Sequence, residues 1–210
     1  MWLQAGIFIL LVGLSGLLWA EWQSHVRLRW LAKPCASFGF LLIAGDAFPL
    51  AGHAPVLIFT GLVLGAGGDL FLLGANRRSF FLGLLLFLLG HIAYALCFLH
   101  VLTSFEALWL PALVILCLLG GVGRRAWPYL GRMKIAVAAY MVVIGAMLVL
   151  AYGDGIPTIW TLAATLFAGS DLFVLRQRFI HKTRVNRFWG LPLYYAAQAL
   201  LAASLRILGF

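Results

Sequence analysis

Apolar runs long enough to cross a lipid bilayer occupy most of the sequence, and they constrain the fold more than any other feature. Each run has roughly 16 to 23 residues, and a helix needs about 20 to cross the ~30 Å hydrocarbon core. Inside a bilayer, every backbone N–H and C=O must be paired within the protein, so runs of this length are expected to be α-helices. The expected spans are residues 2–20, 30–46, 55–75, 79–101, 107–123, 134–151, 157–175 and 188–208.

The chain has too little polar surface to coat a soluble globule. Hydrophobic residues make up 64% of the 210 residues, and charged residues only 10%. A net charge of +9 would suggest a nucleic-acid partner in a soluble protein, but here the basic residues lie in short connections between apolar runs. The composition therefore predicts an all-α, polytopic membrane protein with eight transmembrane helices and no nucleic-acid partner.

The basic residues also predict how the chain crosses the membrane. Fourteen of the fifteen Lys and Arg residues lie in or beside the first, third, fifth and seventh connections. Short loops rich in these residues stay cytoplasmic, so both termini are expected outside, with Arg206 reaching the outer surface. The first run has no basic segment before it and is expected to remain as a span. In a bacterium, the membrane would be the inner one.

A short motif occurs twice in the apolar sequence. Gly67–Leu73 reads GGDLFLL, and Gly169–Leu175 reads GSDLFVL 102 positions later. The runs that follow the two copies also match, because Phe81-Leu82-Gly83 precedes His91 at the same spacing as Phe188-Trp189-Gly190 precedes Gln198. We therefore expect one membrane domain built from two four-helix halves, about residues 1–106 and 107–210. Because each half has an even number of spans, the halves should be parallel repeats.

The repeat commits two carboxylates, Asp69 and Asp171, to surroundings where a charge is costly. Both should lie in the cytoplasmic half of the bilayer, roughly 21 Å from the outer ends of their helices. Asp69 follows Gly61 and Gly65 at four-residue spacing, which places it on a face where a neighbouring helix can approach closely. A single such aspartate could be structural, paired with Lys33 or a neighbouring helix. Two in matching contexts favour a functional site.

Other polar residues are expected to gather around these acids in a zone open to the cytoplasm. Their depths, judged from the helical rise, converge on the cytoplasmic half and the midplane. The candidate binding residues are Lys33, His91, Tyr94, Tyr140, Tyr194 and Gln198. Asp46, Glu106 and Asp154 border outer loops and should be solvated. The three cysteines are isolated in apolar runs and should serve helix packing.

A pair of buried carboxylates is suited to acid and base chemistry. Burial raises the pKa of a carboxyl group, and a second acid nearby raises one of the pair further, so that one stays protonated. Lys33 at the cytoplasmic mouth would suit a phosphate headgroup. There is no HExxH, GxSxG or P-loop motif, so metalloprotease, serine hydrolase and ATPase functions have no support. No cofactor or metal is expected, although two acids and a histidine could in principle hold a metal.

The order and spacing of these residues resemble a known membrane family along nearly the whole chain. The segments that carry the resemblance are Lys33-Pro34, Gly68-Asp69, His91 with Tyr94, Tyr140, and Ser170-Asp171. Together they resemble the YhhN-like lysoplasmalogenases, and eight spans is the number this resemblance implies. It further implies hydrolysis of the sn-1 vinyl ether bond of lysoplasmalogen to a fatty aldehyde and glycerophosphoethanolamine or glycerophosphocholine.

The chemistry of the residues and the resemblance lead to the same hypothesis. Vinyl ether hydrolysis needs a positioned acid and then a base, and Asp69 and Asp171 would share these roles. The expected partners are a lysophospholipid and the bilayer, with a homo-oligomer possible. Two alternatives stay open from the sequence: a small proton-coupled transporter, and a membrane hydrolase of another lysolipid.

Overall fold

The structure, a computed structural model, describes residues 2–74 and 76–209, and in them the chain forms eight α-helices and no β-strand. The all-helical fold with eight helices, expected from the apolar runs, is therefore confirmed. The helices are α1 (Trp2–Trp22), α2 (Val26–Gly45), α3 (His53–Leu72), α4 (Arg77–Val101), α5 (Trp109–Ala126), α6 (Lys134–Ala151), α7 (Thr158–Leu175) and α8 (Arg184–Ile207).

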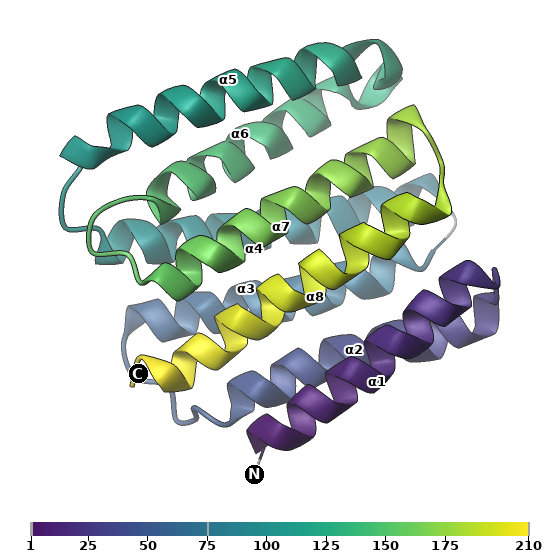
Figure 1. Ribbon diagram of the computed structural model, residues 1–210, viewed down its shortest axis with the longest axis horizontal. Coiled ribbons are helices and arrows are strands. Elements are labelled where there is room, and N and C mark those ends of the chain that lie inside the picture. The colour runs from purple at the N-terminus through teal and green to yellow at the C-terminus, as the bar shows by residue number, and fades with distance from the viewer. Residues whose placement is uncertain (1, 75, 210) are drawn as a thin grey trace.

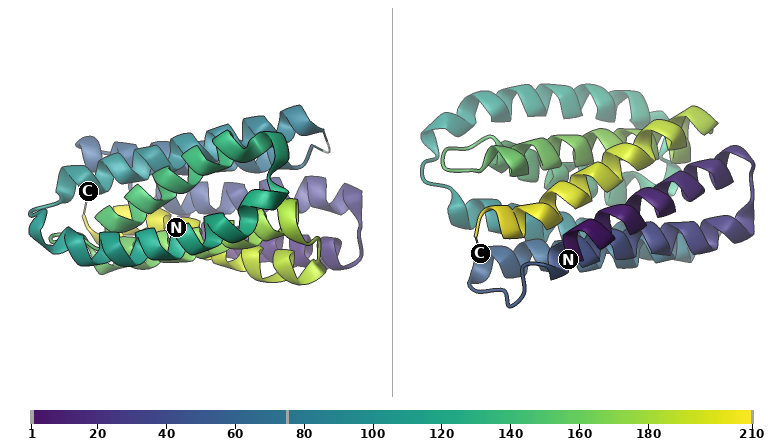
Figure 2. Two further views of the ribbon diagram at one scale, coloured as in Figure 1. Left: turned by 90° about the horizontal axis from the view of Figure 1, so that it is seen from above. Right: turned by 60° about the horizontal axis from the view of Figure 1, so that its bottom comes forward.

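The helices lie side by side along roughly one direction (Figure 1). α1 and α2 form one edge of the bundle and α5 the other, as the views in Figure 2 also show. The four connections that carry the basic residues lie at one end, and both termini lie at the opposite end (Figure 1). The connections rich in basic residues, which alternate along the sequence with connections that lack them, are thus gathered at one end of the bundle.

Among the described residues, six helical segments are long and apolar enough to cross a membrane, and these include every main helix except α2 and α8. The exceptions have a physical reason, because their polar side chains face inward. Lys33 and Ser37 of α2, and Asn186 and Gln198 of α8, are all buried. These two helices are therefore the polar lining of a bundle whose outer surface is apolar.

The starts of α2 and α8 differ from the expected ones, residues 30 and 188. Side-chain caps allow each helix to begin about one turn earlier: His25 accepts a hydrogen bond from Leu28 N at 3.2 Å, and Thr183 accepts one from Asn186 N at 3.3 Å. Lys33 consequently lies about two turns inside α2 rather than at its start. The expected start at residue 30 was too late, because a search for apolar runs does not detect a charged first turn of a helix.

At the end where the termini lie, Arg206 of α8 forms an ion pair with Asp46, the residue that follows α2. Asp46 was expected to be solvated, but its side chain is only 10% exposed because it faces this guanidinium. Glu106 and Asp154 are exposed, as expected. The Arg206 pair joins α2 to α8 at the end opposite the basic connections.

The helices that carry the repeated motif each pack against the helix that follows, α3 against α4 and α7 against α8. Two further contacts, α4 with α6 and α2 with α8, would exchange under a two-fold axis that relates the halves. The division into parallel halves near residue 106 stays a prediction, as does the side of the membrane on which each end lies.

Candidate active site

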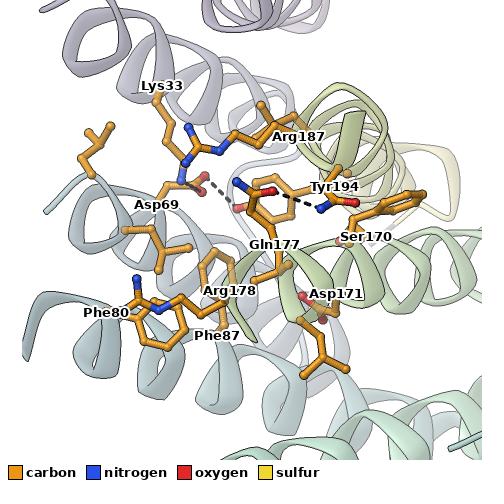
Figure 3. Close-up of a pocket in the computed structure, with 18 of the residues that line it drawn as sticks. Lys33, Asp69, Phe80, Phe87, Ser170, Asp171, Gln177, Arg178, Arg187 and Tyr194 are labelled. Carbon is orange, nitrogen blue, oxygen red and sulfur yellow. Dashed lines mark hydrogen bonds and ion pairs between the residues drawn. The ribbon is translucent and has the colours of Figure 1, made fainter. Parts of the chain in front are cut away.

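A pocket of about 510 Å³ lies between the helices. Its lining includes Asp69, Asp171, Lys33, Tyr140 and Tyr194. Part of the wall comes from the connection between α7 and α8, so the pocket extends to the end of the bundle that carries the basic residues (Figure 3). The repeat therefore brings both aspartates to one mixed polar and apolar pocket.

Asp69 of α3 is buried and fully engaged as a carboxylate. Its Oδ1 lies 3.0 Å from Lys33 Nζ. Its Oδ2 accepts hydrogen bonds from Ser37 Oγ at 2.7 Å, from Tyr194 OH at 2.8 Å and, more weakly, from Tyr195 OH at 3.4 Å. An ammonium and three hydroxyls therefore fix the position of the Asp69 carboxyl group.

A chain of hydrogen bonds behind the pocket wall fixes the direction of the Tyr194 hydroxyl. Tyr94 OH donates to Gln198 Oε1 at 2.8 Å, and Gln198 Nε2 donates to Tyr194 OH at 3.1 Å. Because Tyr194 OH accepts from Gln198, its own hydrogen is directed at Asp69. A Cβ at Gly61 would lie 2.2 Å from the Tyr94 ring, and a Cβ at Gly65 would lie 2.2 Å from Gln198 Nε2. The two glycines therefore make room for this chain.

Asp171 of α7 has a different environment. Its side chain is 15% exposed, and its Oδ2 accepts a hydrogen bond from Tyr140 OH at 3.3 Å. His91 of α4 is fully buried, with Nε2 3.4 Å from Asp171 Oδ2, and this nitrogen makes no hydrogen bond with the described residues. His91 Nδ1 lies 2.6 Å from the Phe87 carbonyl oxygen, which can only accept, so Nδ1 carries a hydrogen. Nε2 faces the Asp171 carboxyl group, and the Phe87 contact does not require a hydrogen on this nitrogen.

Aromatic rings separate the two carboxylate environments. Phe167 contacts His91 at a ring-centroid distance of 4.4 Å and Tyr194 at 5.3 Å, while Phe87 contacts Tyr194 at 5.6 Å. The rings meet edge to face, which is the favoured geometry for aromatic pairs. Of these rings, Phe87 and Tyr194 line the pocket, and the Phe87 ring gives part of the wall an apolar surface suited to a hydrocarbon chain.

The structure divides the expected site residues into two groups. Lys33, Asp69, Tyr140, Asp171 and Tyr194 line the pocket. By contrast, Tyr94, His91 and Gln198 are at most 1% exposed and are not among the lining residues. They contact the lining residues rather than the pocket because helix depth, on which the expectation rested, does not report which way a side chain points.

Several residues of the site were not expected from the sequence. Ser37 and Tyr195 contact Asp69, and a signal existed for the first: it lies one helical turn after Lys33, on the same face of α2. Glu21 lines the pocket and pairs with Arg187 and, at 3.5 Å, with Arg29. These charges resembled ordinary loop residues in the sequence.

In residues 2–74 and 76–209, no group of three or more His, Cys, Asp or Glu side chains is placed to hold a metal ion. His91 and Asp171 are adjacent, but Asp69 is engaged by Lys33 and by hydroxyls.

Comparison with known proteins gives consistent results. The model of the YhhN family matches residues 28–205. The bovine protein named lysoplasmalogenase TMEM86A is 32% identical over 176 residues, which cover 79% of this chain and 71% of the bovine protein. The Mycobacterium tuberculosis protein named lysoplasmalogenase is 31% identical over 216 aligned positions, covering 96% of this chain and 79% of that protein. No solved structure is significantly similar.

Proposed function

Because the chain belongs to the YhhN family, we propose that it is a multi-pass membrane lysoplasmalogenase that uses Asp69 and Asp171 as its catalytic carboxylates. The reaction adds water across the sn-1 vinyl ether bond and releases a fatty aldehyde and a glycerophospho alcohol. The observation that supports this assignment best is the contrast between the two acids in one pocket. Asp69 is paired with Lys33, whereas Asp171 lies beside His91, a group that can accept or donate a proton.

Asp171 is the acid in this proposal. Protonated Asp171 transfers its proton to the alkene carbon that is not bonded to the ether oxygen. A C–H bond forms there, and the carbon that is bonded to the oxygen becomes part of an oxocarbenium ion. The resulting Asp171 carboxylate then accepts a proton from the water that adds to the cation. Asp171, protonated again, then gives that proton to the glycerol oxygen as the C–O bond breaks, and its carboxylate takes the proton of the hemiacetal hydroxyl as the aldehyde forms. The net change is the uptake of one water molecule.

Asp69 has a complementary role. An anion held by Lys33, Ser37 and Tyr194 does not need to reorganise when positive charge develops nearby. Fixed charges directed at a transition state in a site with little water are among the largest contributions to catalysis. We therefore assign Asp69 to stabilising the oxocarbenium ion, with the hydrocarbon chain lying against the aromatic wall.

His91 is a positioning residue that supports Asp171. Replacing His91 with phenylalanine keeps the ring against Phe167 but removes the nitrogen that faces the carboxyl group. We expect kcat to fall roughly tenfold to a hundredfold with little change in KM, and the pH dependence of kcat to shift. The readout is the steady-state rate of aldehyde release across a pH series.

The His91→Phe effect should be non-additive with loss of the acid, because the two residues act as one unit. The double variant with Asp171→Asn should be no slower than Asp171→Asn alone. Independent, multiplying losses in the double variant would show that His91 does not act through Asp171.

The test of the function itself uses the purified chain in detergent without any ion gradient. We expect aldehyde to appear from lysoplasmalogen in stoichiometric amounts with the glycerophospho product. A panel of lysolipids with ester or amide bonds should give no product. Transport of unchanged lysoplasmalogen into sealed vesicles, with no aldehyde, would instead indicate a carrier.

We also propose that the end with the basic connections faces the cytoplasm. Those connections are short and contain nearly all of the Lys and Arg residues, which retain such loops on the cytoplasmic side. The pocket would then receive its substrate from the cytoplasmic leaflet.

A further inference from the structure

The connection between α7 and α8 is built into the pocket wall. α7 continues into a π-helical turn, Arg176–Ile180, closed by a hydrogen bond from His181 N to Arg176 O at 2.8 Å. Three consecutive residues of this turn, Gln177, Arg178 and Phe179, line the pocket. Short π-helical turns occur frequently at functional sites. The turn thus places the cationic side chain of Arg178 in the lining of the pocket that also contains Asp69 and Asp171.

Partly buried hydrogen bonds fix the backbone of this connection. Gln177 Oε1 accepts hydrogen bonds from Thr183 N at 2.9 Å and from Asn186 Nδ2 at 3.1 Å. Asn186 Nδ2 also donates to His181 O at 2.7 Å. Asn186 is 2% exposed, so this amide network is a permanent part of the core. Lys182, in the middle of the connection, is held at the pocket rim by this network.

The charges that line the pocket do not balance. Asp69 is matched by Lys33, and Glu21 by Arg187 and Arg29, while the third carboxyl group of the lining, Asp171, lies beside His91. Arg178 and Lys182 also line the pocket, and neither has a carboxylate partner within the described part of the chain. The pocket rim therefore has two cations without counter-charges.

Arg178 is held in a geometry suited to an oxyanion. Its guanidinium lies over the Phe80 ring, 4.2 Å from the centroid, and Figure 3 shows the side chain extended across this ring. Stacking of this kind favours one orientation of the planar group of this exposed side chain and leaves its N–H edge free for paired hydrogen bonds to an oxyanion. Phe80 is in turn held edge to face by Phe179, at 6.2 Å.

Retention of a loop in the cytoplasm requires cations, but it does not require them to point into the pocket. Arg176 belongs to the same turn and Arg184 to the first turn of α8, yet neither lines the pocket. Arg184 lies over the Trp22 ring instead. Among these four cations, Arg178 and Lys182 line the pocket, whereas Arg176 and Arg184 do not.

We propose that Arg178 and Lys182 form the binding site for the phosphodiester anion of the substrate headgroup. This proposal rests on the lysoplasmalogenase function. It replaces the expectation that Lys33 binds the phosphate, since the Lys33 ammonium is engaged by Asp69. A free phosphate ion has the same chemistry and could occupy the same place, so the two sources must be separated by experiment.

The test compares Arg178→Gln and Lys182→Gln with the matched control Arg176→Gln, in the full-length chain purified in detergent. Losing a charge-assisted hydrogen bond to phosphate should raise KM for lysoplasmalogen about tenfold in each variant while kcat changes less than about twofold. Arg176→Gln should leave both constants unchanged. On 1-alkenylglycerol, which has the vinyl ether but no phosphate, all three variants should match the wild type.

Binding of the product is a second measurement, and it does not depend on catalysis. Glycerophosphoethanolamine should bind to the wild-type protein in calorimetry and lose about tenfold in affinity in Arg178→Gln, with inorganic phosphate binding more weakly. The proposal is overturned if inorganic phosphate binds at least as tightly as the diester, if Arg176→Gln is equally impaired, or if the KM effect persists on 1-alkenylglycerol. Absence of aldehyde from the wild type would count against the catalytic function. The binding measurement would still show whether Arg178 and Lys182 bind the phosphodiester anion.

Discussion

Replacing Asp171 with asparagine is expected to reduce aldehyde release by about 10²- to 10⁴-fold, the range associated with loss of a general acid. The amide preserves the shape of the side chain and can still accept a hydrogen bond from Tyr140, so the fold should be unaffected. The loss should therefore appear in kcat with little change in KM. Initial rates with purified protein, alongside a thermal unfolding curve in the same detergent, measure both quantities.

A suitable control for this substitution is Asp154→Asn. Asp154 is an exposed carboxylate on the connection between α6 and α7, at the end away from the pocket, so its removal should leave kcat unchanged. If Asp171→Asn retained half of the wild-type rate, another group would have to protonate the alkene, and the assignment of the acid would fall.

Replacing Asp69 with asparagine is expected to cost both stability and activity. It leaves the Lys33 ammonium buried without its counter-charge, and breaking a buried pair in this way typically destabilises a protein by about 3–5 kcal/mol. It also removes the anion that faces the developing cation, so kcat should fall by about 10²- to 10³-fold. Thermal unfolding and initial rates in one detergent separate the two effects.

A double variant distinguishes a structural carboxylate from a catalytic one. Combining Asp69→Asn with Lys33→Met removes both charges, which restores much of the lost stability because no unpaired ion stays buried. If Asp69 contributes its charge to catalysis, the double variant should be stable but inactive. Recovery of activity together with stability would mean that the Asp69–Lys33 pair serves only the fold.

The helical fold follows from the sequence because its cause is local. Each apolar run must satisfy its own backbone hydrogen bonds in a bilayer, so length alone indicates a helix. Run length failed at the starts of α2 and α8, where charged first turns are capped by His25 and Thr183. The Asp46–Arg206 pair was also missed, because it joins residues 160 positions apart.

The site was predictable only in part. The repeated motif identified Asp69 and Asp171, because a buried carboxylate is unusual enough to be noticed in an apolar run. The difference between the two acids depends on contacts across helices, such as Tyr194 with Asp69 and His91 with Asp171, which spacing along the chain does not encode. Arg178 was hidden for the opposite reason: it was one of many basic residues that topology alone explains.

The most direct test of the proposed chemistry is the fate of solvent atoms during turnover. The purified wild-type chain is incubated with lysoplasmalogen in D₂O or in ¹⁸O-labelled water, and both products are examined by mass spectrometry. Protonation of the alkene carbon predicts an aldehyde with a single deuterium on the carbon next to the carbonyl, and a glycerophospho product whose new hydroxyl contains no ¹⁸O. An aldehyde without that deuterium, or ¹⁸O in the glycerol hydroxyl, would contradict acid-catalysed vinyl ether hydrolysis by this pocket.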